Sequence, residues 1–417
     1  MRNAIYGQSG GVTAVINASA CGVIEAARQH SHAIGRVFAA RSGIIGVLDE
    51  DFTDTTDVSD DAIAALRYTP SGVFGSCRFK LDDPATDNRQ FERIVDVFKA
   101  HDIGYFFYNG GGDSADTCIK ISRFADRVDY PLQAILVPKT IDNDLFGTDT
   151  SPGFGSVAKY IAVSTREASF DVRSMSVSST KVFVFEVMGR HAGWIAAAGA
   201  LAADEGYDLS IVIIFPEIAF DRSRFTAKVD AMIHRYGYCT VTVAEGAKLA
   251  DGRFLAEQGH RDAFGHSQLG GAATVVADML SSTLGCKCHW AVADYLQRSA
   301  RHVASRTDVD QAYAVGKAAV EMAMAGDNAI MPTIVRTSND PYTWKIGKVP
   351  LTQVANVENV LPRHFISADG FGITNACRMH LLPLIQGEDP PPYDRGLPRY
   401  ATVQHIGVPK RLEPFKR

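Results

Sequence analysis

Three short apolar runs in the sequence each lead directly into a loop that is rich in glycine or aspartate. The runs and the loops that follow them are residues 4–7 with 8–11, 105–108 with 109–114, and 134–137 with 138–144. Such runs, when glycine or proline follows them, are typical of buried β-strands. Helical stretches separate them, and this alternation predicts an α/β fold with a largely parallel sheet flanked by helices. Because ligands bind at the carboxyl ends of the strands in open α/β sheets, we expect these loops to form the functional site.

Length and charge narrow the class of protein further. A chain of 417 residues is too long for one ordinary core, so we expect two lobes. The formal net charge of −5 disfavours a nucleic-acid-binding protein. No apolar run reaches the ~18 residues that span a membrane, and the early strand-like segment leaves no sign of a signal peptide. Seven cysteines, an odd number, indicate free thiols in a reducing compartment, so we expect a cytoplasmic protein.

The two glycine turns offer places where the backbone could hold an anion. Gly10 and Gly11 lie between a predicted strand and a predicted helix, whose first N–H groups have no partner within the helix. A tight turn without a ligand explains these glycines equally well. The second turn, residues 110–114, adds the carboxylate of Asp113 and the hydroxyl of Ser114. Since Mg²⁺ in phosphoryl transfer is held by one or two carboxylates, this turn is a candidate metal site, with a helix N-cap as the alternative.

The densest group of polar residues is Thr140-Ile141-Asp142-Asn143-Asp144, which follows Lys139 at the end of a predicted strand. Transfer of a phosphoryl group to a hydroxyl needs a base for the leaving proton. An aspartate with an ordinary pKa near ~4 is ionised at neutral pH and can take that proton. In an extended chain Asp142 and Asp144 point the same way, which suits one base and one metal contact. An Asx-rich turn is the alternative.

Basic residues also lie near glycine turns and strand ends, where they could clamp phosphate. They are Arg78, Lys139, Lys181, Arg190 and Arg298. A guanidinium group binds phosphate through two parallel hydrogen bonds. Taken one at a time, a solvated surface charge remains the commoner explanation for each of them.

Four motifs occur along the chain in a characteristic order. They are Thr140–Asp144, Met188-Gly189-Arg190, Pro216-Glu217 and Tyr295-Leu296-Gln297-Arg298. With the glycine turns, they make most of the chain resemble the phosphofructokinase family, and in particular its pyrophosphate-dependent branch. The resemblance implies reversible transfer of a phosphoryl group from pyrophosphate to fructose 6-phosphate, with Mg²⁺ as cofactor, in glycolysis and gluconeogenesis.

The resemblance also implies the architecture around the site. We expect two Rossmann-like lobes with the active site in the cleft between them. The donor-binding lobe would comprise residues 1–150 with 303–345, and the sugar-phosphate-binding lobe residues 151–302 with 346–417. A homodimer or homotetramer is expected, with Lys181 where many relatives carry an arginine that reaches across a subunit interface.

Each motif residue acquires an expected role from the resemblance. Asp142 is the expected base for the sugar 1-hydroxyl, and Lys139 and Arg78 are expected to stabilise the phosphoryl group in transfer. The residues expected at the sugar phosphate are Thr140, Ile141, Lys181, Met188, Gly189, Arg190, Glu217, Tyr295 and Arg298. Those expected at the donor are Gly10, Gly11, Asp113 and Ser114, and those expected at Mg²⁺ are Asp113 and Asp144.

Two positions favour pyrophosphate over ATP as the donor. ATP-dependent relatives have Gly-Gly-Asp-Gly-Ser in the second turn and Pro-Gly-Thr before Ile-Asp, whereas this chain has Asp113 and Lys139 at the altered positions. The Asp113 carboxylate would repel the α-phosphate of ATP, and like charges at ~4 Å cost about 4 kcal/mol at an effective dielectric of about 20. Lys139 would add the positive charge that pyrophosphate needs. Gly112 stands where many relatives carry a metal-binding aspartate, which leaves Asp113 to serve both metal and donor.

The sequence leaves three alternatives open. An ATP-dependent phosphofructokinase differs only in its donor. A non-catalytic sugar-phosphate-binding subunit would have no need of the base at Asp142 or of Asp144 and Lys139. A lipid or nicotinamide-nucleotide kinase shares a Gly-Gly-Asp turn but would not need residues 188–190 and 295–298 in this order.

Overall fold

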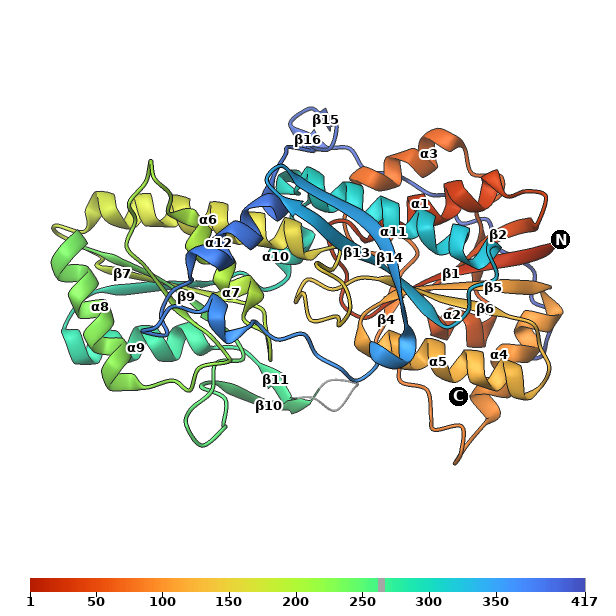
Figure 1. Ribbon diagram of the computed structural model, residues 1–417, viewed down its shortest axis with the longest axis horizontal. Helices are drawn as coiled ribbons and strands as arrows, with labels where there is room; N and C mark the ends of the chain where they lie inside the picture. Colours follow the sequence, from red (N-terminus) through yellow and green to blue (C-terminus); the bar gives the residue numbers. More distant parts are fainter. Residues whose placement is uncertain (262–266, 417) are drawn as a thin grey trace.

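The computed structural model describes residues 1–261 and 267–416. They form two lobes that lie side by side along the longest axis of the molecule, each built around its own β-sheet (Figure 1). The first lobe contains both ends of the described chain (Figure 1). Among the described residues, no helix is both long and apolar enough to cross a membrane.

The described part of the first lobe contains an eight-stranded sheet in the order β14-β13-β6-β5-β1-β2-β3, with β4 also paired to β1. The strands are β1 (Arg2–Ser9), β2 (Ile34–Ala40), β3 (Phe52–Asp54), β4 (Ser76–Cys77), β5 (Ile103–Gly110), β6 (Gln133–Pro138), β13 (Ile330–Asn339) and β14 (Tyr342–Pro350). Only β3 and β14, at the two edges, pair antiparallel. The three predicted strands are therefore the neighbours β1, β5 and β6, so the loops that follow them meet at one edge of the sheet.

Helices cover both faces of this sheet, which explains why its strands are apolar without alternation. In β5, Phe106 packs in the core on one face and Phe107 in the core on the other. Figure 1 shows α1 and α11 on one side of the sheet and α2, α4 and α5 on the opposite side. The helices of this lobe are α1 (Ile16–Gln29), α2 (Ile44–Asp49), α3 (Asp60–Ala64), α4 (Arg89–Ala100), α5 (Gly112–Arg127) and α11 (Arg306–Met324).

The second lobe contains a four-stranded parallel sheet in the order β12-β7-β9-β8. Its strands are β7 (Val182–Val187), β8 (Ile211–Ile214), β9 (Cys239–Ala244) and β12 (Cys288–Val292). Phe185 and Val184 of β7 pack in separate cores on the two faces. The helices are α6 (Phe154–Met175), α7 (Trp194–Ala198), α8 (Arg222–Tyr236), α9 (Ala272–Leu284), α10 (Asp294–Ser299) and α12 (Asn375–Leu381).

Short elements complete the described chain. The remaining strands form two small hairpins, β10 (Glu257–Arg261) with β11 (Ser267–Leu269), and β15 (Tyr393–Asp394) with β16 (Leu397–Pro398). The 3-10 turns are η1 (Ala65–Tyr68), η2 (Gly199–Ala202), η3 (Arg301–Val303), η4 (Leu351–Gln353), η5 (Arg363–Phe365) and η6 (Leu382–Ile385). The two α/β lobes agree with the fold class that the sequence predicts.

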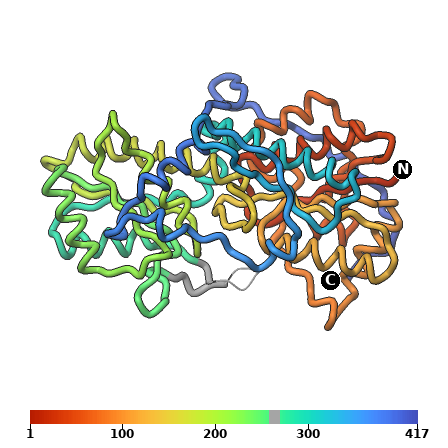
Figure 2. The backbone as a smooth tube through the Cα atoms, in the orientation of Figure 1, coloured from red at the N-terminus to blue at the C-terminus, as the bar shows by residue number. Residues whose placement is uncertain are grey.

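After β14 the chain passes from one lobe to the other and back (Figure 2). Leu351 packs in a first-lobe core, Leu361 and Leu384 pack in a second-lobe core, and Phe415 packs against the first-lobe core again. The described part of residues 346–417, all of which we expected in the sugar-phosphate-binding lobe, therefore packs against both lobes. We propose that residues 346–355 and 401–416 count with the donor-binding lobe.

Glu50 attaches the C-terminal part of the chain to the first lobe. Its fully buried carboxylate accepts hydrogen bonds from Arg93 Nη2 at 3.2 Å and from the backbone N–H groups of Arg411 at 2.9 Å and Leu412 at 3.1 Å. His101 Nε2 lies 2.7 Å from the same carboxylate. A buried carboxylate with this many partners is satisfied rather than destabilising.

Candidate active site

A cavity of about 1010 Å³ lies where the two lobes meet. Its walls include the loops that follow β1, β4, β5 and β6 in the first lobe and β7 and β9 in the second, together with α10. These loops all follow the carboxyl ends of parallel strands, which is the position at which open α/β sheets bind ligands.

The cavity brings together most of the residues that the sequence predicts to be functional. Those that line it are Gly11, Arg78, Asp113, Lys139, Thr140, Ile141, Asp142, Asp144, Met188, Arg190, Tyr295 and Arg298. Gly10, Ser114, Lys181, Gly189 and Glu217 are not among its lining residues.

Asp142 is half-buried in the loop that follows β6, and its backbone N–H donates to Thr140 Oγ1 at 3.1 Å. Burial raises the pKa of the Asp142 carboxyl well above its usual range, and the carboxylates of Asp144 and Glu245 raise it further. The pKa of this carboxyl group thus departs upward from the ordinary value that the sequence analysis assumed. The loop is shielded from solvent because Ile141, next to Asp142, packs in the core of the second lobe. A carboxyl group with a raised pKa is a stronger base toward a hydroxyl.

Lys139 is almost completely buried beside the first glycine turn. Burial lowers the pKa of its ammonium group to about 8; the Asp144 carboxylate opposes this shift and the Arg78 guanidinium adds to it. A Cβ atom on Gly10 would lie 3.4 Å from Lys139 Nζ, and Gly10 has a positive φ of 72°. Glycine at position 10 thus permits the left-handed backbone beside the ammonium group.

Two guanidinium groups converge on the neighbouring glycine. A Cβ atom on Gly11 would lie 2.8 Å from Arg298 Nη1 and 3.7 Å from Arg78 Nη2. The Tyr295 ring stacks on Arg298 at 3.9 Å from the centroid to Cζ. Burial lowers the pKa of Arg298, and Arg78 contributes in the same direction. Positive charges held this close together stabilise a multiply charged anion. Arg298, which we expected at the sugar phosphate, faces the donor turn in this structure.

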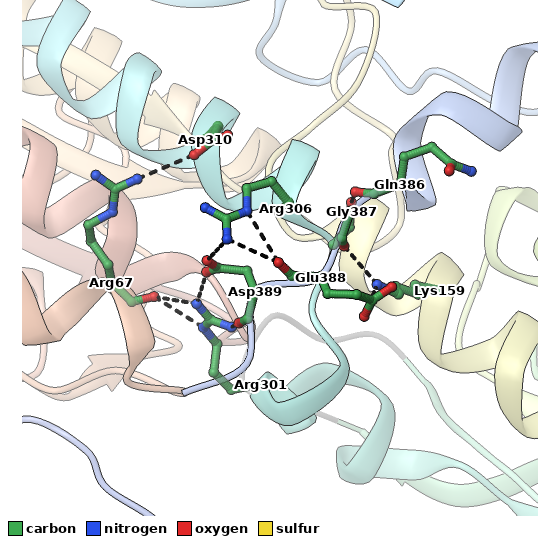
Figure 3. A network of polar contacts seen from close by, with 10 residues as sticks. Arg67, Lys159, Arg301, Arg306, Asp310, Gln386, Gly387, Glu388 and Asp389 are labelled. Carbon is green, nitrogen blue, oxygen red and sulfur yellow. Dashed lines mark hydrogen bonds and ion pairs between the residues drawn. The ribbon is translucent and has the colours of Figure 1, made fainter. Parts of the chain in front are cut away.

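The turn that follows α10 begins with Arg301, which belongs to a network of ion pairs and hydrogen bonds (Figure 3). Arg301, whose side chain is completely buried, pairs with Asp389 and donates to the backbone oxygen of Arg67 at 2.9 Å from Nη2. Arg306 Nη2 lies 3.1 Å from the other oxygen of Asp389. The segment at residue 389 is therefore bonded directly to the turn that follows α10.

The predicted residues outside the cavity lining have different local roles. Glu217 Oε1 accepts hydrogen bonds from the backbone N–H groups of Gly193 at 2.7 Å and Leu361 at 3.0 Å. Lys181 precedes β7, at the end of that strand opposite to the cavity, where its N–H donates to Lys287 O. Gly189 has a φ of 128° and its oxygen accepts from Gly246 N, so it shapes the turn between Met188 and Arg190.

Ser114 is buried in the first turn of α5, beneath Gly110. Its Oγ lies 2.0 Å from where a Cβ atom on Gly110 would be. The close approach explains glycine at position 110, and it directs the Ser114 hydroxyl toward the turn rather than toward the open cavity.

Several residues that line the cavity were missed by the sequence analysis. They are Val12, His191, Ala192, Glu245, Leu269, Asp294, Asn356, Val357 and Glu358. Glu245 directly follows β9, so the same search for polar residues at strand ends could have found it. Burial raises the pKa of its carboxyl group, and Arg190 opposes this shift. Residues 356–358 have no local sequence motif that would mark them as functional. They reach the cavity only because the chain crosses from the first lobe to the second at this point.

The carboxylates of the cavity fit a Mg²⁺ ion that is shared with substrate. Within the described residues no group of three His, Cys, Asp or Glu side chains is arranged to hold a metal alone. Mg²⁺ usually takes one or two carboxylates, several waters and substrate phosphates, so such a cage is not required. Asp113 and Asp144 line the same cavity, and burial raises the pKa of Asp144, which a nearby cation would offset.

Comparison with known proteins agrees with this geometry. The family model for Phosphofructokinase matches residues 3–292. The pyrophosphate–fructose 6-phosphate 1-phosphotransferase of Methylococcus capsulatus is 64% identical over 411 residues, which are 99% of this chain and 98% of the relative. The protein of the same name from Halomonas elongata is 61% identical over 414 residues, covering 99% of both chains. The crystal structure of a pyrophosphate-dependent phosphofructokinase from Nitrosospira multiformis superposes with a TM-score of 0.93 at 61% identity, over 100% of each chain. The chain therefore belongs to the phosphofructokinase family.

Proposed function

We propose that the protein transfers a phosphoryl group reversibly between pyrophosphate and the 1-hydroxyl of fructose 6-phosphate, giving fructose 1,6-bisphosphate and phosphate. The observation that carries the proposal is the cluster of Lys139, Arg78 and Arg298 around Gly10 and Gly11. This concentration of positive charge suits a donor that consists only of phosphate groups. The names of the full-length relatives support the same activity.

In the proposed mechanism, Asp142 accepts the proton of the sugar 1-hydroxyl as that oxygen attacks phosphorus. Lys139 and Arg78 stabilise the charge on the phosphoryl group in transfer, with Thr140 and the backbone of the glycine turns beside it. Asp113 and Asp144 would hold Mg²⁺, which supplies charge neutralisation for the phosphates when bound. The second-lobe turn at 188–190 and Tyr295 of α10 hold the sugar phosphate, and Arg298, beside Gly11, lies where it can contact both the sugar phosphate and the donor. The phosphoryl group is transferred in line between the two.

The remaining expected residues enter the proposal as follows. Gly10, Gly11 and Ser114 form the donor turns, and Ile141 and Glu217 fix the loops that contact the sugar. Lys181 is assigned to the neighbouring subunit's sugar phosphate. The reversible reaction would operate in both glycolysis and gluconeogenesis.

A donor assay tests the proposed activity. With aldolase coupled to detect fructose 1,6-bisphosphate, the purified protein is expected to turn over with pyrophosphate and not with ATP. Turnover with ATP alone would instead identify an ATP-dependent enzyme, and binding of fructose 6-phosphate without turnover would identify a non-catalytic subunit.

The Lys139→Met variant is expected to lower kcat/KM for pyrophosphate by about 10- to 150-fold, the range for loss of a charge-assisted hydrogen bond. Methionine has similar length but no charge, so the shape of the glycine turn is kept. Steady-state kinetics with varied pyrophosphate measure the effect, and Lys99→Met on the exposed face of α4 is the control. An unchanged kcat/KM would remove Lys139 from donor binding.

We further propose a homodimer or homotetramer in the cytoplasm. None of the seven cysteines, all of which lie in the described part of the chain, forms a disulfide bond, as is usual in a reducing compartment. Strand β12 forms an edge of its sheet and exposes Trp290 by 48%, and the adjacent α10 exposes Leu296 by 65%. Exposed apolar residues along an unpaired edge are typical of a protein interface.

The Trp290→Ser variant is expected to shift the mass measured by light scattering during size-exclusion chromatography toward that of the monomer. Val128→Ser, at an exposed apolar residue of the first lobe, is the matched control and is expected to keep the wild-type mass. A monomeric wild-type protein would contradict the proposed assembly.

A further inference from the structure

The cavity has a wall that none of the family motifs provides. After η4 the chain leaves the first lobe and crosses to the second through residues 356–361, which we call the crossing segment. Asn356, Val357 and Glu358 of this segment line the cavity. The segment therefore runs along the cleft in which the proposed base and the proposed sugar-binding turn face each other.

Asn359 is bonded to both lobes at once. Its backbone N–H donates to Asp144 O at 2.8 Å and its side-chain Nδ2 donates to Asn143 O at 3.2 Å. Its backbone oxygen accepts from Trp194 Nε1 of the second lobe at 2.9 Å. A single residue thus joins the loop of the proposed base to the first turn of α7.

The loop that Asn359 holds contains a residue with an uncommon backbone conformation. Asn143, between the two aspartates, has a φ of 56°, in the left-handed region that is uncommon for a residue other than glycine. Two successive carbonyls of this turn, those of Asn143 and Asp144, accept the hydrogen bonds from Asn359. The direction of the Asp142 side chain depends on this turn, because Asp142 directly precedes Asn143.

Glu358 and Leu361 complete the attachment. Glu358 pairs in a backbone bridge with Leu145, just after Asp144, and its Oε1 lies 2.7 Å from His191 Nδ1. His191 directly follows Arg190, so this contact reaches the proposed sugar-binding turn. The N–H of Leu361 donates to Glu217, which also accepts from Gly193.

We propose that Asn359 and Glu358 are positioning residues, which fix the Asp142 loop relative to the turn at Met188–Arg190. This inference rests on the proposed function, because the distance between these two loops matters only if a proton and a phosphoryl group move between them. Misplacement by about 1 Å can cost a hundredfold in rate when reacting groups must be aligned. The contacts are partly exposed and add little to core packing, so their loss affects rate more than folding.

The Asn359→Ala variant tests the side-chain part of the first attachment, because it removes the bond from Nδ2 to Asn143 O and keeps the two backbone bonds. We expect kcat to fall by about tenfold while the KM for fructose 6-phosphate stays within about threefold, because the base is misaligned and the sugar contacts are kept. Thermal unfolding is expected at nearly the wild-type midpoint. Val360→Thr is the matched control, since Val360 lies in the same segment, is 45% exposed and does not line the cavity.

Glu358 gives an independent test with a conservative rescue. Glu358→Ala is expected to lower kcat several-fold, whereas Glu358→Gln, whose amide oxygen can still accept from His191 Nδ1–H, is expected to restore most of it. Wild-type kcat in Asn359→Ala and Glu358→Ala would overturn the proposal. So would a loss of kcat matched by an equal loss of folded protein. The wild-type enzyme in the same assay distinguishes failure of the positioning role from failure of the proposed function. If the wild type shows no pyrophosphate-dependent turnover, the proposed function itself is contradicted.

Discussion

In the Asp142→Asn variant, kcat is expected to fall by about a thousandfold, within the range that a general base contributes. Asparagine keeps the size of the side chain but cannot accept the proton of the sugar hydroxyl. The Asp142 carboxyl group can act as a base only in its ionised form, and the amide of asparagine has no such form. Initial rates with saturating pyrophosphate and fructose 6-phosphate measure kcat.

Binding of the sugar phosphate should survive the same change. We expect the Kd for fructose 6-phosphate, measured by calorimetry, to stay within about threefold of the wild-type value. Asp126→Asn, on the exposed end of α5, is the matched control for the chemistry of the substitution. Parallel loss of binding and turnover would assign Asp142 to substrate binding, and unchanged turnover would place the base elsewhere.

The Asp389→Ala variant is expected to lower the free energy of unfolding by about 3–5 kcal/mol, the cost of leaving one member of a buried ion pair without its partner. Arg301 has no exposed side-chain surface, so its charge has no access to water once the carboxylate is gone. Urea denaturation followed by fluorescence measures the difference. We also expect weaker binding of substrate, because the turn after Tyr295 and Arg298 loses its support.

An exposed pair provides the comparison for this effect. Glu321 pairs with Lys317 on α11 at 3.6 Å, with 52% of its side-chain surface exposed. The Glu321→Ala variant should change the free energy of unfolding by no more than about 0.5 kcal/mol, since exposed helical pairs contribute this little. Equal effects of the two substitutions would show that burial of Arg301 does not govern the stability of the network.

The fold and the centre of the site were predictable because their signals are local. An apolar strand followed by a glycine or aspartate loop is visible within about ten residues. Strands β1, β5 and β6 are adjacent, so their three loops converge as the sequence suggested. This convergence brings Asp113, Lys139 and Asp142 into one cavity.

The features that escaped prediction depend on distant parts of the chain. The pKa of Asp142 shifts because the second lobe covers its loop, which no local pattern encodes. Asn359 and Glu358 reach the cavity only through the passage of the chain between lobes. The pairing of Arg301 with Asp389 joins residues 88 positions apart, and either residue alone would be interpreted as a surface charge.

The bonds from Arg411 and Leu412 to Glu50 have a consequence for how the molecule is made. A ribosome produces β1, α2 and Glu50 early, yet the two N–H groups that complete the hydrogen bonds of this carboxylate emerge more than 350 residues later. Until then, Glu50 has only the side chains of Arg93 and His101 as partners. The last step of folding is therefore expected to be the docking of the C-terminal segment onto an almost complete first lobe. A synthetic peptide spanning residues 401–416 should bind to a chain from which these residues have been removed.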